Sequence, residues 1–298
     1  FFFFHKNNEN NLSSFFWLSK ETAIIINNWF MMYFLSVVLI GTIYPIFIDV
    51  LSSQKISVGP PFYHKLIIPF LIPFLFIMAI GPKLKWIRSN LENKIYLISL
   101  LIISILFSYL IVKNFEYNFL INSILISSAL YLFFINLRDF FIQKSQNISQ
   151  NTSHFGFSLL ILSILFNNLF STEIITNLKV GETFESSKTK IVFENVSQRT
   201  GKNYESIVGN FSIQNSKGKI EKFLPELRIY NQPNIVTSEA DIKTTLISDK
   251  FIVINLVQNQ DYFNVRYQNK KFMIWIWVSV VLICFGGLMS LLKKKNEK

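Results

Sequence analysis

The stretch S-H-F-G-F-S-L-L-I-L-S-I-L-F-N-N-L-F, residues 153–170, decides the fold, because it joins a series of apolar segments to a long polar region. Its length and apolar character predict a membrane-spanning helix. It also carries one imidazole, that of His154, and an ionisable side chain on a membrane helix is costly. The stretch therefore predicts both a membrane crossing before the polar region and a candidate functional residue.

Helical spacing divides this stretch into two faces. The face that contains His154 also contains Ser158, Ile161 and Leu165. The face roughly opposite carries small or polar side chains, at Gly156, Ser163 and Asn167. Small side chains let another helix approach closely, so we expect a helix on that second face. We expect the His154 face to meet a ligand or a partner helix.

Two interpretations of His154 stay open on these grounds. Its imidazole is either an axial metal ligand or a side chain at a helix start that is hydrogen-bonded to the backbone or to interfacial water. Residue type alone does not choose between them.

The composition excludes one ordinary soluble domain. The chain has 298 residues, 51% of them apolar, and a mean hydropathy of +0.37. Six apolar segments are predicted to cross a hydrocarbon core of about 30 Å as helices. They are residues 22–43, 66–80, 95–112, 119–135, 153–170 and 272–292.

The connection after the first span is predicted to be an ordered extramembrane loop at 44–63. Pro45, the polar S-S-Q-K at 52–55 and the V-G-P-P at 58–61 all oppose a continuous helix. Gly59, Pro60 and Pro61 restrict the backbone, so this part of the loop has little freedom to lose when a partner binds.

Residues 171–270 carry strand signals. β-branched and aromatic residues gather at 191–193, 209–214, 251–257 and 262–267, and Gly, Pro and Asn residues separate these runs. This spacing fits a small β sandwich or barrel of about 100 residues. We therefore predict a polytopic α-helical membrane protein of about six transmembrane helices, with an extramembrane all-β domain between the last two helices.

The predicted division of the chain has four parts. They are an N-terminal tail at 1–21, a membrane domain with five helices at 22–170, the β domain at 171–270, and the final transmembrane helix with a basic tail at 271–298.

The net charge of +11 is explained by membrane topology. Lys20, the basic cluster at 83–94, Arg138 and the lysines at 293–295 fall on one side if six helices cross in turn. The positive-inside rule then places both termini inside and the β domain outside. No basic run is interleaved with stacking aromatics on a recognisable binding module, so we expect no nucleic-acid partner.

Motifs of soluble catalysis are absent from the sequence. It has no phosphate loop, no nucleophile elbow and no H-E-x-x-H helix, and its one cysteine, Cys284, excludes an intrachain disulfide and a C-x-x-C-H haem attachment. Glu226 and Arg228 alternate along a predicted strand, which favours a cross-strand ion pair or surface charges over acid–base chemistry. His5 and His64 are predicted to be solvated.

Seven sequence elements, taken in order, resemble the CcmF-type haem lyase subunit of cytochrome c maturation. They are L-S-K-E-T-A-I-I-I-N-N (18–28), G-T-I-Y-P with K-I-S-V-G-P-P (41–45 and 55–61), I-G-P-K-L-K-W (80–86), S-H-F-G (153–156), L-P-E-L-R-I-Y (224–230), T-S-E-A-D-I (237–242), and V-R-Y, W-I-W and G-G-L within 265–288. The likeness covers nearly the whole chain but only the family's C-terminal part. It marks a set of structural or partner-binding motif residues: Lys20, Glu21, Gly59, Pro60, Pro61, Glu226 and Arg228.

The resemblance implies a function in a haem lyase complex. The assembled lyase joins haem vinyl groups to the two thiols of an apocytochrome c C-x-x-C-H motif, outside the membrane. By the same resemblance, His154 is expected to be one axial ligand of an internal b haem, which passes electrons to the substrate haem.

The sequence also departs from the family pattern. Family members carry an upstream tryptophan-rich loop that binds the haem being attached, and a second intramembrane histidine that pairs with the one in the S-H-F-G position. Neither is in this sequence, so we expect a C-terminal product of a split lyase, or a fragment of a longer one, that shares the b haem with another chain. Its implied partners are the N-terminal half with the haem loop, a haem chaperone, apocytochrome c and the lipid bilayer, and no catalytic residue is assigned.

Composition and resemblance together predict a mitochondrial inner-membrane location, with the β domain facing the intermembrane space. The 32 phenylalanines and the four alanines are typical of A/T-rich organellar genes, and a bacterial plasma membrane is the alternative. Two other functions stay open. A transporter or channel-like protein is suggested by proline-interrupted spans with an intramembrane histidine, and the β domain alone suggests a non-catalytic assembly subunit.

Overall fold

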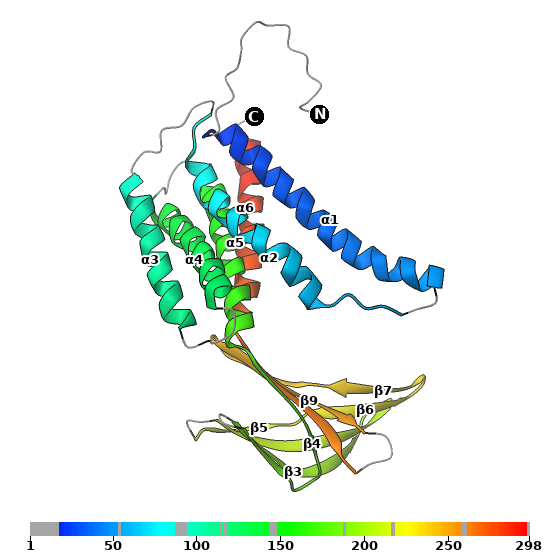
Figure 1. The fold of residues 1–298 in the computed structure, drawn as a ribbon. Coiled ribbons are helices and arrows are strands. Elements are labelled where there is room, and N and C mark those ends of the chain that lie inside the picture. The colour runs from blue at the N-terminus through cyan, green and yellow to red at the C-terminus, as the bar shows by residue number, and fades with distance from the viewer. Residues whose placement is uncertain are drawn as a thin grey trace, which may run out of the picture. The chain divides into compact units, whose positions relative to one another are not determined.

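The computed structural model describes residues 18–52, 55–86, 94–113, 115, 119–142, 148–186, 189–215, 218–257 and 261–296 (Figure 1). Most of the predicted N-terminal tail, with His5, and residues 87–93 of the predicted basic cluster lie outside these described residues. The chain divides into two compact units, Phe1–Asn151 and Thr152–Lys298.

Helices make up the first unit, and in the second unit one helix precedes the strands along the chain and another follows them (Figure 1). They are α1 (Lys20–Ser52), α2 (Pro60–Ile80), α3 (Lys94–Val112), α4 (Phe119–Ile142), α5 (Ile148–Phe170) and α6 (Met273–Asn296), with a 3₁₀ turn, η1 (Gly81–Lys83), directly after α2. By length and composition, six helices of the described part are able to cross a membrane. The predicted fold class, with an all-β domain between the fifth and last of these helices, is confirmed.

The loop predicted at 44–63 is wrong at both of its ends. Helix α1 continues through Pro45 to Ser52, and α2 already begins at Pro60. A proline inside a helix removes one backbone hydrogen bond, and its ring presses on the carbonyl of the residue four positions earlier, here Gly41. Membrane helices tolerate this because neighbouring groups satisfy the freed backbone. At the start of α2 the prolines fit, since the first N–H groups of a helix have no helical partner.

The corrected boundary makes α1 unusually long. Its 33 residues extend for about 50 Å, whereas the hydrocarbon core of a bilayer is about 30 Å thick. Gly41 on α1 lets α2 approach closely. A Cβ atom added to Gly41 would lie only 2.6 Å from the hydroxyl oxygen of Tyr63 on α2.

Helix α4 provides much of the core of the first unit. The side chains of Ala129 and Leu132 are almost completely buried. The rings of Phe76 on α2 and Tyr131 on α4 lie 5.7 Å apart. The hydroxyl of Ser108 on α3 donates a hydrogen bond to the carbonyl of residue 123 on α4, at 2.6 Å. These contacts hold α2, α3 and α4 together.

The second unit contains the β domain. Its strands are β1 (Thr172–Leu178), β2 (Thr183–Ser186), β3 (Thr189–Thr200), β4 (Tyr204–Asn215), β5 (Ile220–Phe223), β6 (Glu226–Asn231), β7 (Asn234–Glu239), β8 (Asp241–Thr244), β9 (Ser248–Leu256) and β10 (Phe263–Lys271). One antiparallel sheet has the order β1-β10-β9-β8, and the other has the order β2-β3-β4-β6-β7 with β5 also paired to β4. The four predicted strand runs fall in β3, β4, β9 and β10.

Both sheets contribute to one apolar core. Phe193 on β3 stacks on Phe211 on β4, with ring centroids 4.3 Å apart, and both face the buried Ile252 and Val265 of the other sheet. Buried Ile252 and Ile254 are separated by a less buried residue on β9, as are Val265 and Tyr267 on β10, which is the pattern expected of strands with one covered face.

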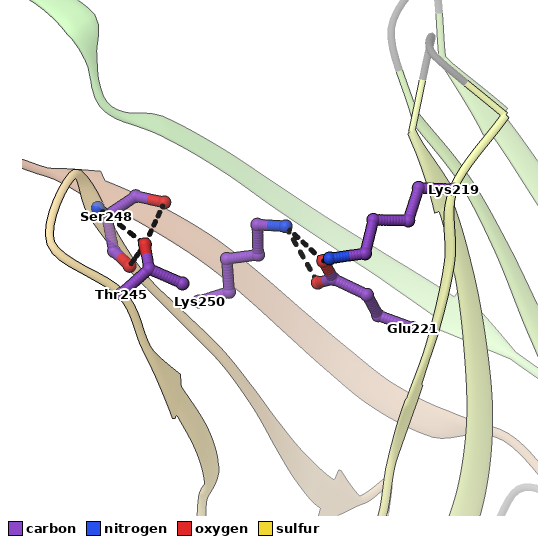
Figure 2. A network of polar contacts seen from close by, with 5 residues as sticks. All are labelled: Lys219, Glu221, Thr245, Ser248 and Lys250. Carbon is purple, nitrogen blue, oxygen red and sulfur yellow. Dashed lines mark hydrogen bonds and ion pairs between the residues drawn. The ribbon is translucent and has the colours of Figure 1, made fainter.

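A buried ion pair also joins the two sheets (Figure 2). Nζ of Lys250, on β9, lies 2.8 and 2.7 Å from the two carboxylate oxygens of Glu221, on β5, and both side chains are almost nine-tenths buried. Lys219 adds a second cation, 3.3 Å from the same carboxylate. Nearby, burial and the charge of Glu221 raise the pKa of Tyr267 to about 12.

Candidate functional site

His154 lies nearly two turns inside α5. The helix begins at Ile148, so the imidazole is about 9 Å along its axis. The side chain is half-buried. The helix begins before the predicted span does, in the polar segment 148–152, so His154 does not lie at its start.

The opposite face of α5 packs against α6, as the small residues predict. A Cβ atom added to Gly156 would lie 3.0 Å from the backbone nitrogen of Ile283 and 3.0 Å from the carbonyl oxygen of Ser279. Ser163 on α5 and Ser279 on α6 are both buried. Without a side chain at Gly156 the two backbones come into contact, as in other small-residue helix pairs of membranes.

Two hydrogen bonds reinforce this pairing. The hydroxyl of Ser153 donates to the carbonyl of Ile283, at 3.4 Å. The side-chain amide of Asn167 donates to the carbonyl of Lys271, just before α6, at 2.6 Å. Asn167 thus ties the end of α5 to the start of α6.

The position of His154 follows from this packing. It lies about 200° around the helix from Gly156, so it is on the face of α5 that is turned away from α6. Ser158, one turn further along the same face, is buried, and its hydroxyl donates to the carbonyl of Phe155. A neutral imidazole on a fixed helix can act as an axial ligand to a metal.

His154 is the only histidine in the described part of the second unit. No group of three or more His, Cys, Asp and Glu side chains able to hold a metal ion occurs in the described ranges. Cys284 is exposed on α6. The arrangement fits one axial position of a larger site and does not fit a complete protein-only metal site.

Lys20 and Glu21 lie at the start of α1, where two of the motif segments meet. The backbone N–H of Lys20 donates to the carbonyl of Lys85, at 3.0 Å, and its Nζ lies 5.2 Å from the centre of the Trp86 ring. Ser19 caps the helix by accepting a hydrogen bond from the N–H of Thr22, at 3.2 Å. Glu21, in the first turn, is exposed, and its negative charge interacts favourably with the positive end of the helix dipole.

An ion pair that the sequence does not predict lies beside this junction. Nζ of Lys83, in η1, binds the carboxylate of Asp139 on α4, and both side chains are largely buried. The guanidinium of Arg138 lies 4.2 Å from the centre of the Tyr96 ring on α3. The sequence offers one clue to this pair, the acidic residue Asp139 directly after Arg138 at the end of a span. Its position does not show which cation it binds.

Gly59, Pro60 and Pro61 form the start of α2. Gly59 is extended, with φ −98° and ψ 178°, and the two prolines occupy the first helical positions. The N–H of Phe62 donates to the carbonyl of Gly59, at 3.2 Å. These residues therefore define where the helix begins, and no described side chain there has the chemistry of a catalytic group.

Glu226 and Arg228 form an ion pair within one strand, β6. Nε of Arg228 lies 3.1 Å from a carboxylate oxygen of Glu226, and Arg199, on β3, lies 3.6 Å from the other oxygen. The Arg228 guanidinium also lies 4.8 Å from the centre of the Tyr204 ring. The hydrogen bond that Arg228 donates to Glu226 raises the pKa of Arg228 above its usual value. The guanidinium of Arg228 therefore stays charged, which suits recognition or stability and not proton transfer.

Comparison with known proteins shows what this architecture is similar to. Residues 169–271, which include every strand described above, match the family model "CcmF C-terminal beta-sandwich". Cytochrome c-type biogenesis protein CcmF of Pseudomonas fluorescens is 24% identical over 279 residues, which are 87% of this chain and 42% of that protein. The protein of the same name from Escherichia coli (strain K12) is 25% identical over 88% of this chain. This chain resembles the C-terminal part of CcmF.

The fold of a CcmF protein agrees with this resemblance. A solved structure titled "Cytochrome c Heme Lyase CcmF" superimposes with a TM-score of 0.69, at 21% identity, over 92% of this chain and 46% of that one. The chain spans about two fifths of the length of the curated CcmF relatives that it matches. It is a multi-pass membrane protein with the CcmF C-terminal architecture.

Proposed function

We propose that this chain acts as the C-terminal part of a cytochrome c haem lyase, and that His154 supplies one axial ligand to an internal b haem. The observation that carries this proposal is the position of His154. It lies within a spanning helix, on the face opposite the α6 contact, in a chain similar to CcmF proteins along 87% of its length.

The chemistry of the residues fits one half of such a haem site. Imidazole is a strong axial ligand for haem iron, and when bound a b haem supplies one-electron redox chemistry. Of the three histidines in the sequence, His64 is exposed near the start of α2 and His5 lies outside the described residues. The second axial ligand is therefore proposed to come from another chain or from sequence outside these 298 residues.

The remaining residues of α5 would hold the ligand in place. Gly156 and Asn167 fix the helix against α6, which sets the direction in which the imidazole points. A ligand that is held in position before iron binds loses less entropy on binding. In the proposed reaction each cysteine thiol of apocytochrome c adds across a haem vinyl group, so a sulfur–carbon bond forms, the hydrogen passes to the neighbouring carbon and no atom leaves.

The proposed partners are the N-terminal half of the lyase, a haem chaperone and apocytochrome c. The proposed location is the mitochondrial inner membrane, or the plasma membrane of a bacterium, with the β sandwich outside. Support for this orientation comes from the first unit, where Lys20, Lys83 and Arg138 gather at the ends of α1, α2 and α4. Such a basic cluster is typical of the inner side of a membrane.

A reduced-minus-oxidised absorption spectrum of the purified complex tests the proposal. If the chain is a lyase subunit with a b haem, we expect the spectrum of material that contains this chain to show a b-type α band. A transporter, or an assembly subunit without a cofactor, predicts none, and the absence of the band from a complex that includes the partner chain would contradict the proposed function.

A further inference from the structure

The turn between β8 and β9 lies at the end of the β sandwich from which the membrane helices depart. Lys271, the last residue of β10, pairs with Ser248, the first residue of β9, and Thr172 at the start of β1 pairs with Asn269. Helix α5 ends two residues before β1, and α6 begins two residues after β10. The β8–β9 turn, residues 245–247, therefore lies beside both helix ends.

Hydrogen bonds connect this turn directly to the start of α6. The N–H of Phe272 donates to the carbonyl of Ile247, at 2.8 Å, and Nε1 of Trp275 donates to the carbonyl of Leu246, at 3.0 Å. Phe272 has a φ of 59°, a left-handed conformation that is rare for an aromatic residue, and its bond to Ile247 helps to hold it there. Turn and helix start are thus one connected structure.

The turn is also rigid in itself (Figure 2). The N–H of Thr245 donates to the carbonyl of Ser248 at 3.0 Å, and the Thr245 hydroxyl donates to the same carbonyl at 2.8 Å. The N–H of Ser248 donates back to the Thr245 hydroxyl oxygen, at 3.1 Å. These bonds leave little freedom for the two residues between them.

Those two residues are large, aliphatic and exposed. The side chain of Leu246 is 72% exposed and that of Ile247 is 62% exposed. Polar residues usually fill such tight turns, so a rigid turn that displays two aliphatic side chains is unusual in water. The same side chains would be stable in an apolar medium, because aliphatic surface is stabilised when it leaves water.

We propose that the β8–β9 turn inserts Leu246 and Ile247 into the interfacial layer of the lipid bilayer, and that it thereby anchors the β sandwich to the membrane surface. The occupant is lipid because the turn is bonded to Trp275, in the first turn of a helix long and apolar enough to span. Trp275 and Trp277 belong at the level of lipid headgroups, where such aromatic rings concentrate. Lys270 lies near the end of β10, close to the same level, where lysine is attracted to lipid phosphates.

Single cysteines on the full chain test this proposal. In a Cys284→Ser background, Leu246→Cys and Ile247→Cys would report on the turn, and Val180→Cys would be the matched control. Val180 is 49% exposed and lies in the turn after β1, at the other end of the sheet, about 23 Å from the end of α5. The chain, with the proteins that co-purify with it, is placed in phospholipid nanodiscs, so that reagents reach both sides.

The expected result has two parts. A charged, membrane-impermeant maleimide should label the turn cysteines about tenfold or more slowly than Val180→Cys, because an apolar environment raises the thiol pKa and each pKa unit removes about nine-tenths of the thiolate. Spin labels at 246 and 247 should collide more often with oxygen than with a nickel chelate, and the label at 180 should show the reverse order.

Two other outcomes would overturn the proposal. Labelling of the turn cysteines as fast as that of Val180→Cys, with frequent nickel collisions, would place the turn in water. Infrequent collisions with both oxygen and nickel would show that a protein partner covers the turn.

Discussion

Gly156 on α5 lies so close to α6 that a Cβ atom added to it would be 3.0 Å from the carbonyl oxygen of Ser279. This approach is closer than nearly all natural contacts of a Cβ atom. It determines which face of α5 meets α6, and therefore places His154 on the other face. The small-residue face and the histidine face are two parts of one arrangement.

Replacing Gly156 should weaken the second unit. Gly156→Val adds a branched side chain where only hydrogen fits, and overpacking of this kind typically costs about 1 to 3 kcal/mol. Gly287→Val is the control, because nothing lies within 4 Å of a Cβ atom at that position of α6. Thermal unfolding in detergent should show a lower midpoint for the first variant only, and equal losses for both would contradict the close packing of α5 on α6.

The ion pair between Glu221 and Lys250 should stabilise the β sandwich in a pH-dependent way. Burial alone would raise the pKa of Glu221, but hydrogen bonds and charges from Lys250 and Lys219 outweigh it and hold the pKa below its usual 4.5. A carboxylate with a lowered pKa stabilises the fold at pH above about 4.5, and that contribution is lost as the pH falls through the folded-state pKa. The temperature at which the wild-type chain is half unfolded should therefore be lower at pH values below about 4.5 than at neutral pH.

Mutation of the pair separates charge from packing. Lys250→Met leaves Glu221 largely buried without its main cation. The loss in the free energy of unfolding should lie between about 1 kcal/mol, as for an exposed ion pair, and about 3 to 5 kcal/mol, as for a fully buried pair that loses one partner. The double variant Glu221→Met with Lys250→Met should recover much of the loss, because it leaves no unpaired charge. Protease resistance of the sandwich in the full chain, measured against temperature, reports the result. A double variant as unstable as the single one would show that the sheets are held by other contacts.

Sequence patterns predict most of this fold because each depends on local spacing. Length and hydropathy identify the spanning helices, and runs of β-branched and aromatic residues identify β3, β4, β9 and β10. The small-residue face of α5 is also readable, since Gly156, Ser163 and Asn167 recur at helical spacing. His154 stands out because it is the only histidine within the apolar runs.

The features that the sequence does not predict depend on contacts between residues far apart in the chain. Pro45 opposes a helix locally, yet α1 continues through it because flanking apolar residues favour the helix. Asp139 and Lys83 are 56 residues apart, so only the folded chain shows that they pair. The proposed role of Leu246 and Ile247 is likewise not evident from the sequence, since it is inferred from the hydrogen bonds of their turn to the start of α6.

The proposed orientation places the β sandwich outside and both termini inside. Protease added to intact mitoplasts, or to right-side-out bacterial vesicles, should cleave within 172–271 and should leave the lysine-rich C-terminal end protected. Disruption of the membrane with detergent is the control, because it should expose both regions. Cleavage of the C-terminal end alone in intact material would reverse the topology.

His154 carries the central claim, and its replacement in the assembled complex tests that claim most directly. Amplitude of the b-type band in a reduced-minus-oxidised spectrum, per mole of chain, is the quantity to measure. His64→Ala is the control, because that histidine is exposed on α2. If His154 only donated or accepted a hydrogen bond, its replacement would lower the free energy of unfolding by about 1 to 3 kcal/mol and would not change the spectrum. Loss of an axial ligand should instead remove most of the band while the protein stays folded, and added imidazole should restore part of it. The account predicts this loss for His154→Ala and a wild-type spectrum for His64→Ala, and a wild-type b-haem content in a folded His154→Ala complex would contradict it.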